Sequence, residues 1–256
     1  CQLVWHNRVV LKLPREKWCT HNLIFKSNKF TNIYPCNDRG SIYIKKVNEG
    51  FDTKQKLFRI LVYRLFNKIE TFEKIKHLCT TDKWNTEEAI RIITEWRDRQ
   101  QGVPFGSAYM ITGAGDYKTS HDKVVIVCND VIKNDILKSY DTLYEGVSKA
   151  NTLQLVHNWL TIPKMYGGFS GYVALQDCVR CGVIPFTMND WYDSKNTPGA
   201  RKALEIIFPG ILDNEMTNKV YQLRDSQREE FKRLNLDFKY LDGKELGLLE
   251  TENSLC

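Results

Sequence analysis

Apolar residues recur every three or four positions along most of this 256-residue chain, and this spacing constrains the fold more than any other feature. In residues 55–78 the spacing produces a single stripe of Phe58, Val62, Leu65, Ile69 and Phe72. Such a stripe is typical of an amphipathic helix with one face on the core. Residues 213–234 show the same periodicity, so the sequence predicts an all-α fold.

Helix-capping signals place several further helices. Asn85 with Glu88 predicts a helix start that Gly102 and Pro104 bring to an end, and Thr197 before Pro198 predicts another start. Residues 122–149 predict one or two helices, although 124–127 (VVIV) also fit a short strand. The tail after Asp242 is expected to fray. We expect one helical domain over residues 1–256, or two lobes that meet near residues 105–150.

Positive charge is concentrated at the start of the chain. The net charge is +6. Residues 1–60 hold twelve Lys or Arg and four acids, a net +8, so the other residues sum to −2. Aromatic side chains are interleaved with these cations, and that combination suits a polyanion such as DNA. An ordinary solvated surface is the alternative.

The sequence indicates neither a metal nor a nucleotide cofactor. The eight cysteines have no framework spacing, and Cys178 and Cys181 form a lone pair where structural zinc needs four ligands. GAGDYKTS (113–120) resembles a phosphate-binding loop, but Tyr117 stands where the Walker motif needs glycine. No apolar run reaches the roughly 20 residues of a membrane span. We therefore expect no cofactor, no membrane contact and an intracellular location, bacterial cytoplasm or nucleus.

Gly167 and Gly168 lie between two helical patterns, and they admit two interpretations. One is an αα-corner in which the glycines supply positive φ. The other is a hairpin that brings backbone amides close to a phosphate, with the positive end of the second helix pointing at the ligand.

Five polar positions stand out as candidates for chemistry. Asp190 follows an apolar segment and precedes Trp191, an enclosed setting suited to a carboxylate that accepts a proton. Asp177 lies on the helix after the double glycine, and Asp38 precedes Arg39 at the basic end. Asn67 and Glu70 share a helical flank with Arg59 and Tyr63. For Asp177, Asp38, Asn67 and Glu70, ordinary capping or ion pairing is the alternative.

Five stretches in order make a family resemblance visible: FTNIYPCNDRGSIYI (30–44), LVYRLFNKIETFEKI (61–75), SAYM (107–110), MYGGFSGYVALQD (165–177) and NDWYDSKNTPGA (189–200). Over about residues 20–210 the chain resembles helical DNA-base hypermodification proteins of phages and some eukaryotes. These are the α-glutamyl/putrescinyl-thymine pyrophosphorylases and the amino acid:DNA transferases. The same kind of helical domain accompanies 5-hydroxymethyl-deoxyuridine DNA kinases. The family resembles helix-hairpin-helix DNA glycosylases in turn.

The resemblance implies a glycosylase-like helical fold, a flipped base and roles for particular residues. Asp190, 22 residues after Gly168, is the first candidate for the base that deprotonates an amine, and Glu70 and Asp177 follow. The implied substrate- and DNA-binding residues are Asp38, Arg39, Asn67, Tyr109, Gly167, Gly168, Tyr172 and Gly199. The hairpin reads PKMYGG rather than P-G-x-G, and Phe169 stands near the place of the glycosylases' lysine, which argues against lyase chemistry.

The implied reaction is transfer of an amine to an activated, 5-hydroxymethyl-derived thymine-like base, with loss of phosphate or pyrophosphate. Its partners are DNA, a small amine and a DNA kinase that acts upstream. A DNA glycosylase that excises a modified base and a non-catalytic DNA-binding module are the alternatives.

Overall fold

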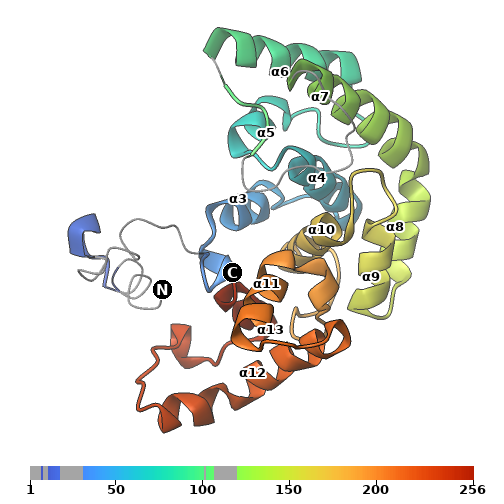
Figure 1. Cartoon of the computed structure of the whole chain (residues 1–256). Coiled ribbons are helices and arrows are strands. Elements are labelled where there is room, and N and C mark those ends of the chain that lie inside the picture. Colours follow the sequence, from blue (N-terminus) through green and yellow to red (C-terminus); the bar gives the residue numbers. More distant parts are fainter. Residues whose placement is uncertain (1–6, 8–10, 18–30, 101, 107–119) are drawn as a thin grey trace. The chain divides into compact units, whose positions relative to one another are not determined.

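The computed structural model describes residues 7, 11–17, 31–100, 102–106 and 120–256, and every regular element in these ranges is helical (Figure 1). The predicted all-α class is therefore confirmed. The chain divides into a central unit, Arg39–Thr187, and a discontinuous unit made of Cys1–Asp38 and Met188–Cys256. The boundary expected near residues 105–150 falls inside the central unit. No helix of the described residues is long and apolar enough to cross a membrane.

The core of the central unit surrounds helix α4 (Thr53–Phe66), which Asp52 caps by accepting a hydrogen bond from the N–H of Gln55 at 2.8 Å. Burial extends around most of its circumference, as expected for a helix enclosed by others, and includes Leu57, Phe58, Ile60, Leu61, Val62, Leu65 and Phe66. Helices α3 (Arg39–Val47), α5 (Ile69–Ile75) and α10 (Gly168–Arg180) belong to the same unit, and α10 packs on both α3 and α4.

The sequence predicts one helix over residues 55–78, but the structure has two, because the helix is interrupted at Asn67. This residue adopts the left-handed conformation at φ 45° and ψ 38°, which asparagine tolerates better than most residues. Its N–H still donates to the carbonyl of Tyr63, and Lys68 is extended before α5 begins. The apolar spacing continues across the break, so periodicity alone gave no sign of it.

The remaining helices of the central unit largely follow the sequence prediction. Asn85 accepts a hydrogen bond from the N–H of Glu88 at 2.9 Å and so caps α6 (Thr86–Gln100). Residues 120–149 are helical throughout: α7 (Ser120–Ile126), a π-helical stretch (Val127–Ile136), a 3-10 turn (Leu137–Ser139) and α8 (Tyr140–Lys149). The strand alternative for 124–127 is therefore wrong. Helix α9 (Leu153–Leu160) then packs against α8 and α10.

In the described part of the discontinuous unit, the α-helices are α11 (Pro198–Ile207), α12 (Asp213–Arg233) and α13 (Leu248–Ser254). Short 3-10 turns lie at Arg15–Lys17, Pro35–Asn37, Ser194–Asn196 and Leu241–Gly243. The frayed tail expected after Asp242 is wrong, because α13 packs on α11 and α12 and buries Leu248 and Leu249. Helix α11 begins after Thr197 as predicted, but the Thr197 hydroxyl hydrogen-bonds the Tyr192 hydroxyl at 2.6 Å instead of capping the helix.

The buried carboxyl of Glu252 on α13 predicts a pH-dependent stability. Burial raises its pKa to about 7 from the usual 4.5, and the Cys256 thiol is its hydrogen-bond donor at 3.4 Å. The folded state then holds this proton more tightly than the unfolded chain does. The stabilisation is therefore complete below about pH 4.5 and is lost as the pH rises towards 7. We expect Glu252→Gln to raise the melting temperature above pH 7 and to flatten its pH profile. Identical profiles for the variant and the wild type would contradict this.

Candidate functional site

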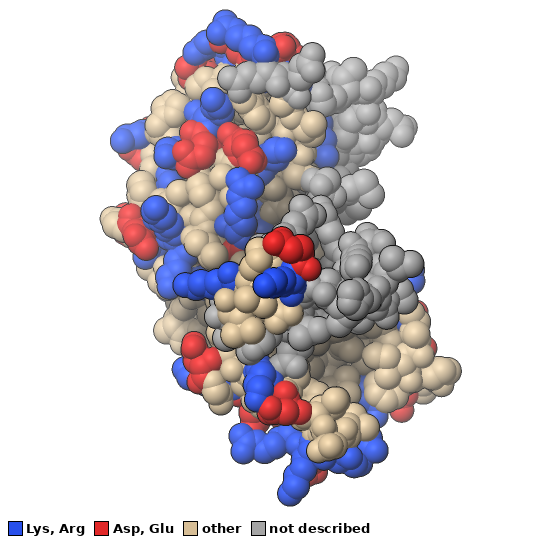
Figure 2. Space-filling model, turned by 90° about the vertical axis from the view of Figure 1, so that its left-hand side faces the viewer, with Lys and Arg blue, Asp and Glu red and all other residues tan. Residues whose placement is uncertain are grey.

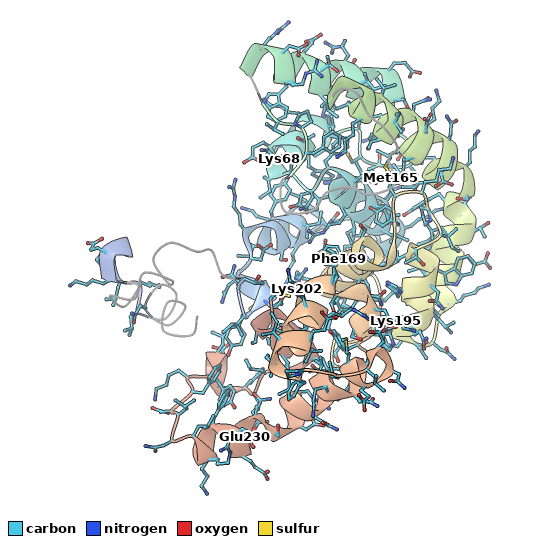
Figure 3. The ribbon with its side chains drawn as sticks, viewed as in Figure 1. Lys68, Met165, Phe169, Lys195, Lys202 and Glu230 are labelled. Carbon is cyan, nitrogen blue, oxygen red and sulfur yellow. The ribbon has the colours of Figure 1, made fainter. Side chains whose placement is uncertain are left out.

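The hairpin between α9 and α10 is fixed by two hydrogen bonds from buried side chains. A ring nitrogen of His157 on α9 hydrogen-bonds the carbonyl of Gly168 at 2.8 Å, and the hydroxyl of Tyr166 donates to the carbonyl of Leu61 on α4 at 2.5 Å. Figure 3 marks Met165 and Phe169, which bracket the turn. The start of α10, where backbone N–H groups lack helical partners, is thus held firmly.

Neither Gly167 nor Gly168 in this hairpin has a positive φ. Gly167 has φ −76° and ψ 180°, whereas the left-handed residue of the turn is Met165 at φ 67°. The αα-corner interpretation, in which the glycines provide positive φ, is therefore wrong in that respect. A Cβ added to Gly167 would have no atom within 4 Å, whereas one on Gly171 would lie 2.6 Å from Cγ2 of Thr161. Gly171 allows α9 and α10 to pack closely, and Gly167 leaves open space at the start of α10.

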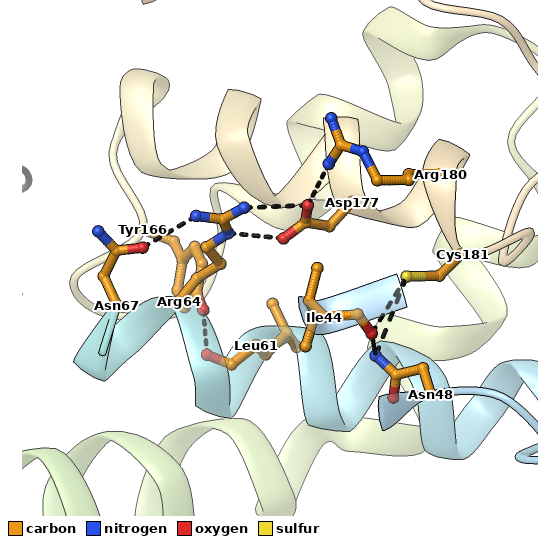
Figure 4. A network of polar contacts seen from close by, with 9 residues as sticks. All are labelled: Ile44, Asn48, Leu61, Arg64, Asn67, Tyr166, Asp177, Arg180 and Cys181. Carbon is orange, nitrogen blue, oxygen red and sulfur yellow. Dashed lines mark hydrogen bonds and ion pairs between the residues drawn. The ribbon is translucent and has the colours of Figure 1, made fainter. Parts of the chain in front are cut away.

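A buried ionic network joins α4 to α10 (Figure 4). The Asp177 side chain is fully buried, and it accepts hydrogen bonds from Arg64 at 2.5 and 3.0 Å and from Arg180 at 2.5 Å. Arg64 is also nearly buried and donates to Oδ1 of Asn67 at 2.9 Å. A carboxylate shared by two guanidinium groups has no open side for a substrate, so this geometry holds helices together.

Two side chains of this network, Arg64 and Arg180, were not among the candidates taken from the sequence. Arg64 occurs inside the RLFN stretch and Arg180 follows Asp177 by three residues, a helical spacing that allows an ion pair. The partnership of Arg64 with Asp177 spans 113 positions, so only the tertiary structure reveals it.

Arg39 and Glu70 form an exposed ion pair at 3.1 Å between α3 and α5. A hydrogen bond from its own backbone N–H, together with Arg39, lowers the pKa of the Glu70 carboxyl. The flank predicted to hold Arg59, Tyr63, Asn67 and Glu70 does not exist as one surface. Arg59 and Tyr63 are only 3% and 2% exposed within α4, and Glu70 lies on a separate helix, α5, after the break at Asn67.

The other residues implied by the resemblance are spread over both units. Tyr172 is buried in α10 of the central unit. Asp190, Asp38 and Gly199 belong to the discontinuous unit, and Tyr109 lies outside the described residues. Asp190 is exposed on a turn, so the apolar enclosure predicted for it is wrong. A Cβ on Gly199 would lie 2.9 Å from the Cys256 sulfur, which gives this glycine a packing role.

The cysteine pair of α10 serves packing in this structure. Cys178 and Cys181 are buried, and burial raises the pKa of the Cys181 thiol to about 11. The Cys181 sulfur lies 3.9 Å from the carbonyl of Ile44 and from Nδ2 of Asn48, at the α3 contact. Within the described ranges, no group of three or more His, Cys, Asp or Glu residues could hold a metal ion.

Charges of both signs are interspersed on the face of the molecule drawn in Figure 2. On α3, Arg39, Lys45 and Lys46 are exposed, and α5 adds Lys74 beside Glu70 and Glu73. Of the twelve Lys and Arg residues in the basic block of residues 1–60, only Arg8, Lys26 and Lys29 lie outside the described residues. The role of this block with a polyanion stays a prediction.

Within the described residues the protein is all-helical, and its α9–α10 hairpin leaves open space at the start of α10. A family model described as "5-hmdU DNA kinase, helical domain" matches residues 2–256. The chain therefore belongs to this family of helical domains, as its resemblance to the domain that accompanies such kinases implied.

One curated relative agrees with the family match. A 5-hmdU DNA kinase of Bacillus phage SP10 is 25% identical over 273 residues, which cover 100% of this chain and 42% of the relative. The chain thus spans less than half the length of that kinase. No solved structure matches the chain.

Proposed function

We propose that this chain engages DNA that contains 5-hydroxymethyluracil and takes part in modifying that base. The observation that carries the proposal is the family match over residues 2–256. The sequence lacks the Walker spacing at GAGDYKTS, where Tyr117 replaces the required glycine. We therefore assign DNA and base recognition to this chain rather than ATP-dependent phosphorylation, and we assign phosphorylation to a kinase that acts before it.

The finer proposal is that the chain transfers an amine to the activated base. The nitrogen of an amino acid or polyamine attacks the exocyclic CH2 carbon of the base, and the C–O bond to phosphate or pyrophosphate breaks. The leaving group takes the bonding electrons, and the nitrogen loses a proton to a carboxylate. Asp190 is exposed and so accessible to an amine, whereas Asp177 is enclosed by two arginines. Asp190 is accordingly our first choice of base, and Glu70, paired with Arg39, is the second.

We further propose that the α9–α10 hairpin acts as the helix-hairpin-helix of glycosylase-like proteins and binds a DNA phosphate. Support comes from the open space at Gly167, which no neighbour inside the described part of the central unit fills, and from the amides at the start of α10. The base itself must leave the helical stack for chemistry at its CH2 carbon.

The hairpin proposal predicts opposite behaviour for two neighbouring glycines. Gly167→Leu should keep the melting temperature within a few degrees, because its Cβ enters open space, and should weaken DNA binding about tenfold by blocking the phosphate. Gly171→Ala is the matched control. It should destabilise the fold by roughly 1–3 kcal/mol through overpacking on Thr161. Full DNA affinity in a folded Gly167→Leu protein would rule out the phosphate contact.

Mass spectrometry of nucleosides tests the function directly. Duplexes with thymine, 5-hydroxymethyluracil or its phosphorylated form are incubated with the protein and a mixture of amino acids and polyamines, then digested. We expect the phosphorylated base alone to lose phosphate and gain the mass of an amine, in an unbroken strand. Abasic sites would instead show a glycosylase. Unchanged bases despite tight DNA binding would show a non-catalytic binding module, and either result overturns the transferase proposal.

A further inference from the structure

The turn Phe105–Gly106 is fixed against the end of α4. The N–H of Gly106 donates to the carbonyl of Phe66 at 2.9 Å, and the Phe105 and Phe66 rings stack at a centroid distance of 5.3 Å. A Cβ added to Gly106 would lie 2.3 Å from the carbonyl oxygen of Asn67, so only glycine permits this approach. The backbone of the turn is therefore held close to the C-terminal end of α4.

The side-chain amide of Asn67 is oriented as a donor at this turn. Its Oδ1 accepts from Arg64 at 2.9 Å, and a guanidinium group can only donate, so the NH2 group must face away from Arg64. Figure 4 shows this nitrogen turned away from the network. Arg64 cannot swing away, because buried Asp177 holds two of its nitrogens. Within the described residues, the Asn67 NH2 group has no hydrogen-bond acceptor.

A partly buried cation borders the same turn. Nζ of Lys123 lies 4.4 Å from the centre of the Phe105 ring, and desolvation lowers the pKa of this ammonium. No carboxylate of the described residues forms an ion pair with it. A desolvated cation beside an aromatic ring gains strongly when an anion reaches it, because little further water must be removed.

We propose that Asn67 and Lys123 form a binding site for a phosphate group of the modified DNA, with Arg64 as the positioning residue that keeps Asn67 in its donating orientation. This inference rests on the proposed function, since that function supplies the DNA. A phosphate suits the site because it offers several acceptor oxygens and negative charge to two donors that have no acceptor among the described residues. The chemistry is shared by two sources: a backbone phosphate, and the phosphate carried by a phosphorylated 5-hydroxymethyl group.

The test measures affinity for three duplexes, containing thymine, 5-hydroxymethyluracil or phosphorylated 5-hydroxymethyluracil, at several salt concentrations. Asn67→Asp keeps the contact to Arg64 and the residue's shape but cannot donate, and Lys123→Met keeps the packing on Phe105 but removes the charge. We expect each change to weaken binding about tenfold or more, and Lys123→Met to lower the salt slope by about one. Asn134→Asp and Lys138→Met, which make the same charge changes at exposed positions of the central unit, should have little effect.

The pattern of loss identifies the source of the phosphate. Equal losses on all three duplexes mean a backbone phosphate, and a loss confined to the phosphorylated base means the phosphate of the base. Arg64→Lys should reproduce the loss of Asn67→Asp without adding to it in the double variant, a non-additivity that a purely structural role would not produce. Wild-type affinity in folded Asn67→Asp and Lys123→Met overturns this inference alone. Failure of the wild type to bind any duplex overturns the proposed function together with it.

Discussion

Replacing Asp177 with asparagine is expected to destabilise the protein by roughly 3–5 kcal/mol, a fall in melting temperature of about 10 °C. The reason is that Arg64 and Arg180, both largely buried, lose the negative charge that neutralises them. Thermal unfolding followed by circular dichroism measures this directly. Activity should fall only in proportion to the unfolded fraction, because the Asp177 carboxylate is enclosed.

Two further variants isolate the cause of this loss. Glu70→Gln removes a carboxylate from the exposed Arg39–Glu70 pair and should cost less than about 1 kcal/mol. The double variant Arg64→Met with Asp177→Leu removes both the acid and its main partner, and should recover part of the stability lost in Asp177→Asn. A folded but inactive Asp177→Asn protein would instead place chemistry on this residue.

For Asp190, the expected effect is on turnover rather than on stability. If this carboxylate accepts the proton of the incoming amine, Asp190→Asn should lower the rate of amine transfer at least a hundredfold. Its melting temperature should barely change, because the residue is exposed on a turn. DNA affinity should stay constant or rise, since a negative charge near phosphates is removed. Turnover, affinity and melting temperature are to be measured on the same preparation.

Asp193 provides a matched control three residues further along. Its carboxylate accepts a hydrogen bond from the N–H of Lys195 at 2.9 Å, and an asparagine oxygen accepts the same bond. Asp193→Asn should therefore keep both turnover and stability. A fully active Asp190→Asn protein would move the proposed base to Glu70, and Glu70→Gln would then have to lose the activity.

The sequence determined the helical class and the approximate course of most helices. Apolar spacing and caps are local properties, so α6, α11 and α12 follow from a few consecutive residues such as Asn85 or Pro198. The order of five motifs gave the family, which the match over residues 2–256 supports in its 5-hmdU DNA kinase branch. The break at Asn67 was not visible, because a single left-handed residue leaves the apolar periodicity on both sides intact.

What only the tertiary structure decided is the environment of each polar candidate. The sequence treated Asp177 and Asp190 as similar carboxylates near apolar residues, whereas one is buried between two arginines and the other is exposed. Only the tertiary structure shows that Gly167 leaves open space whereas Gly171 allows two helices to pack closely. It also shows that Lys123 approaches the turn beside Asn67. The ion pair of Arg64 with Asp177 joins residues 113 positions apart, and a local pattern carries no information about such a partner. Local spacing therefore fixed the helices of this protein, and the packing between them fixed which side chains remain available to a substrate.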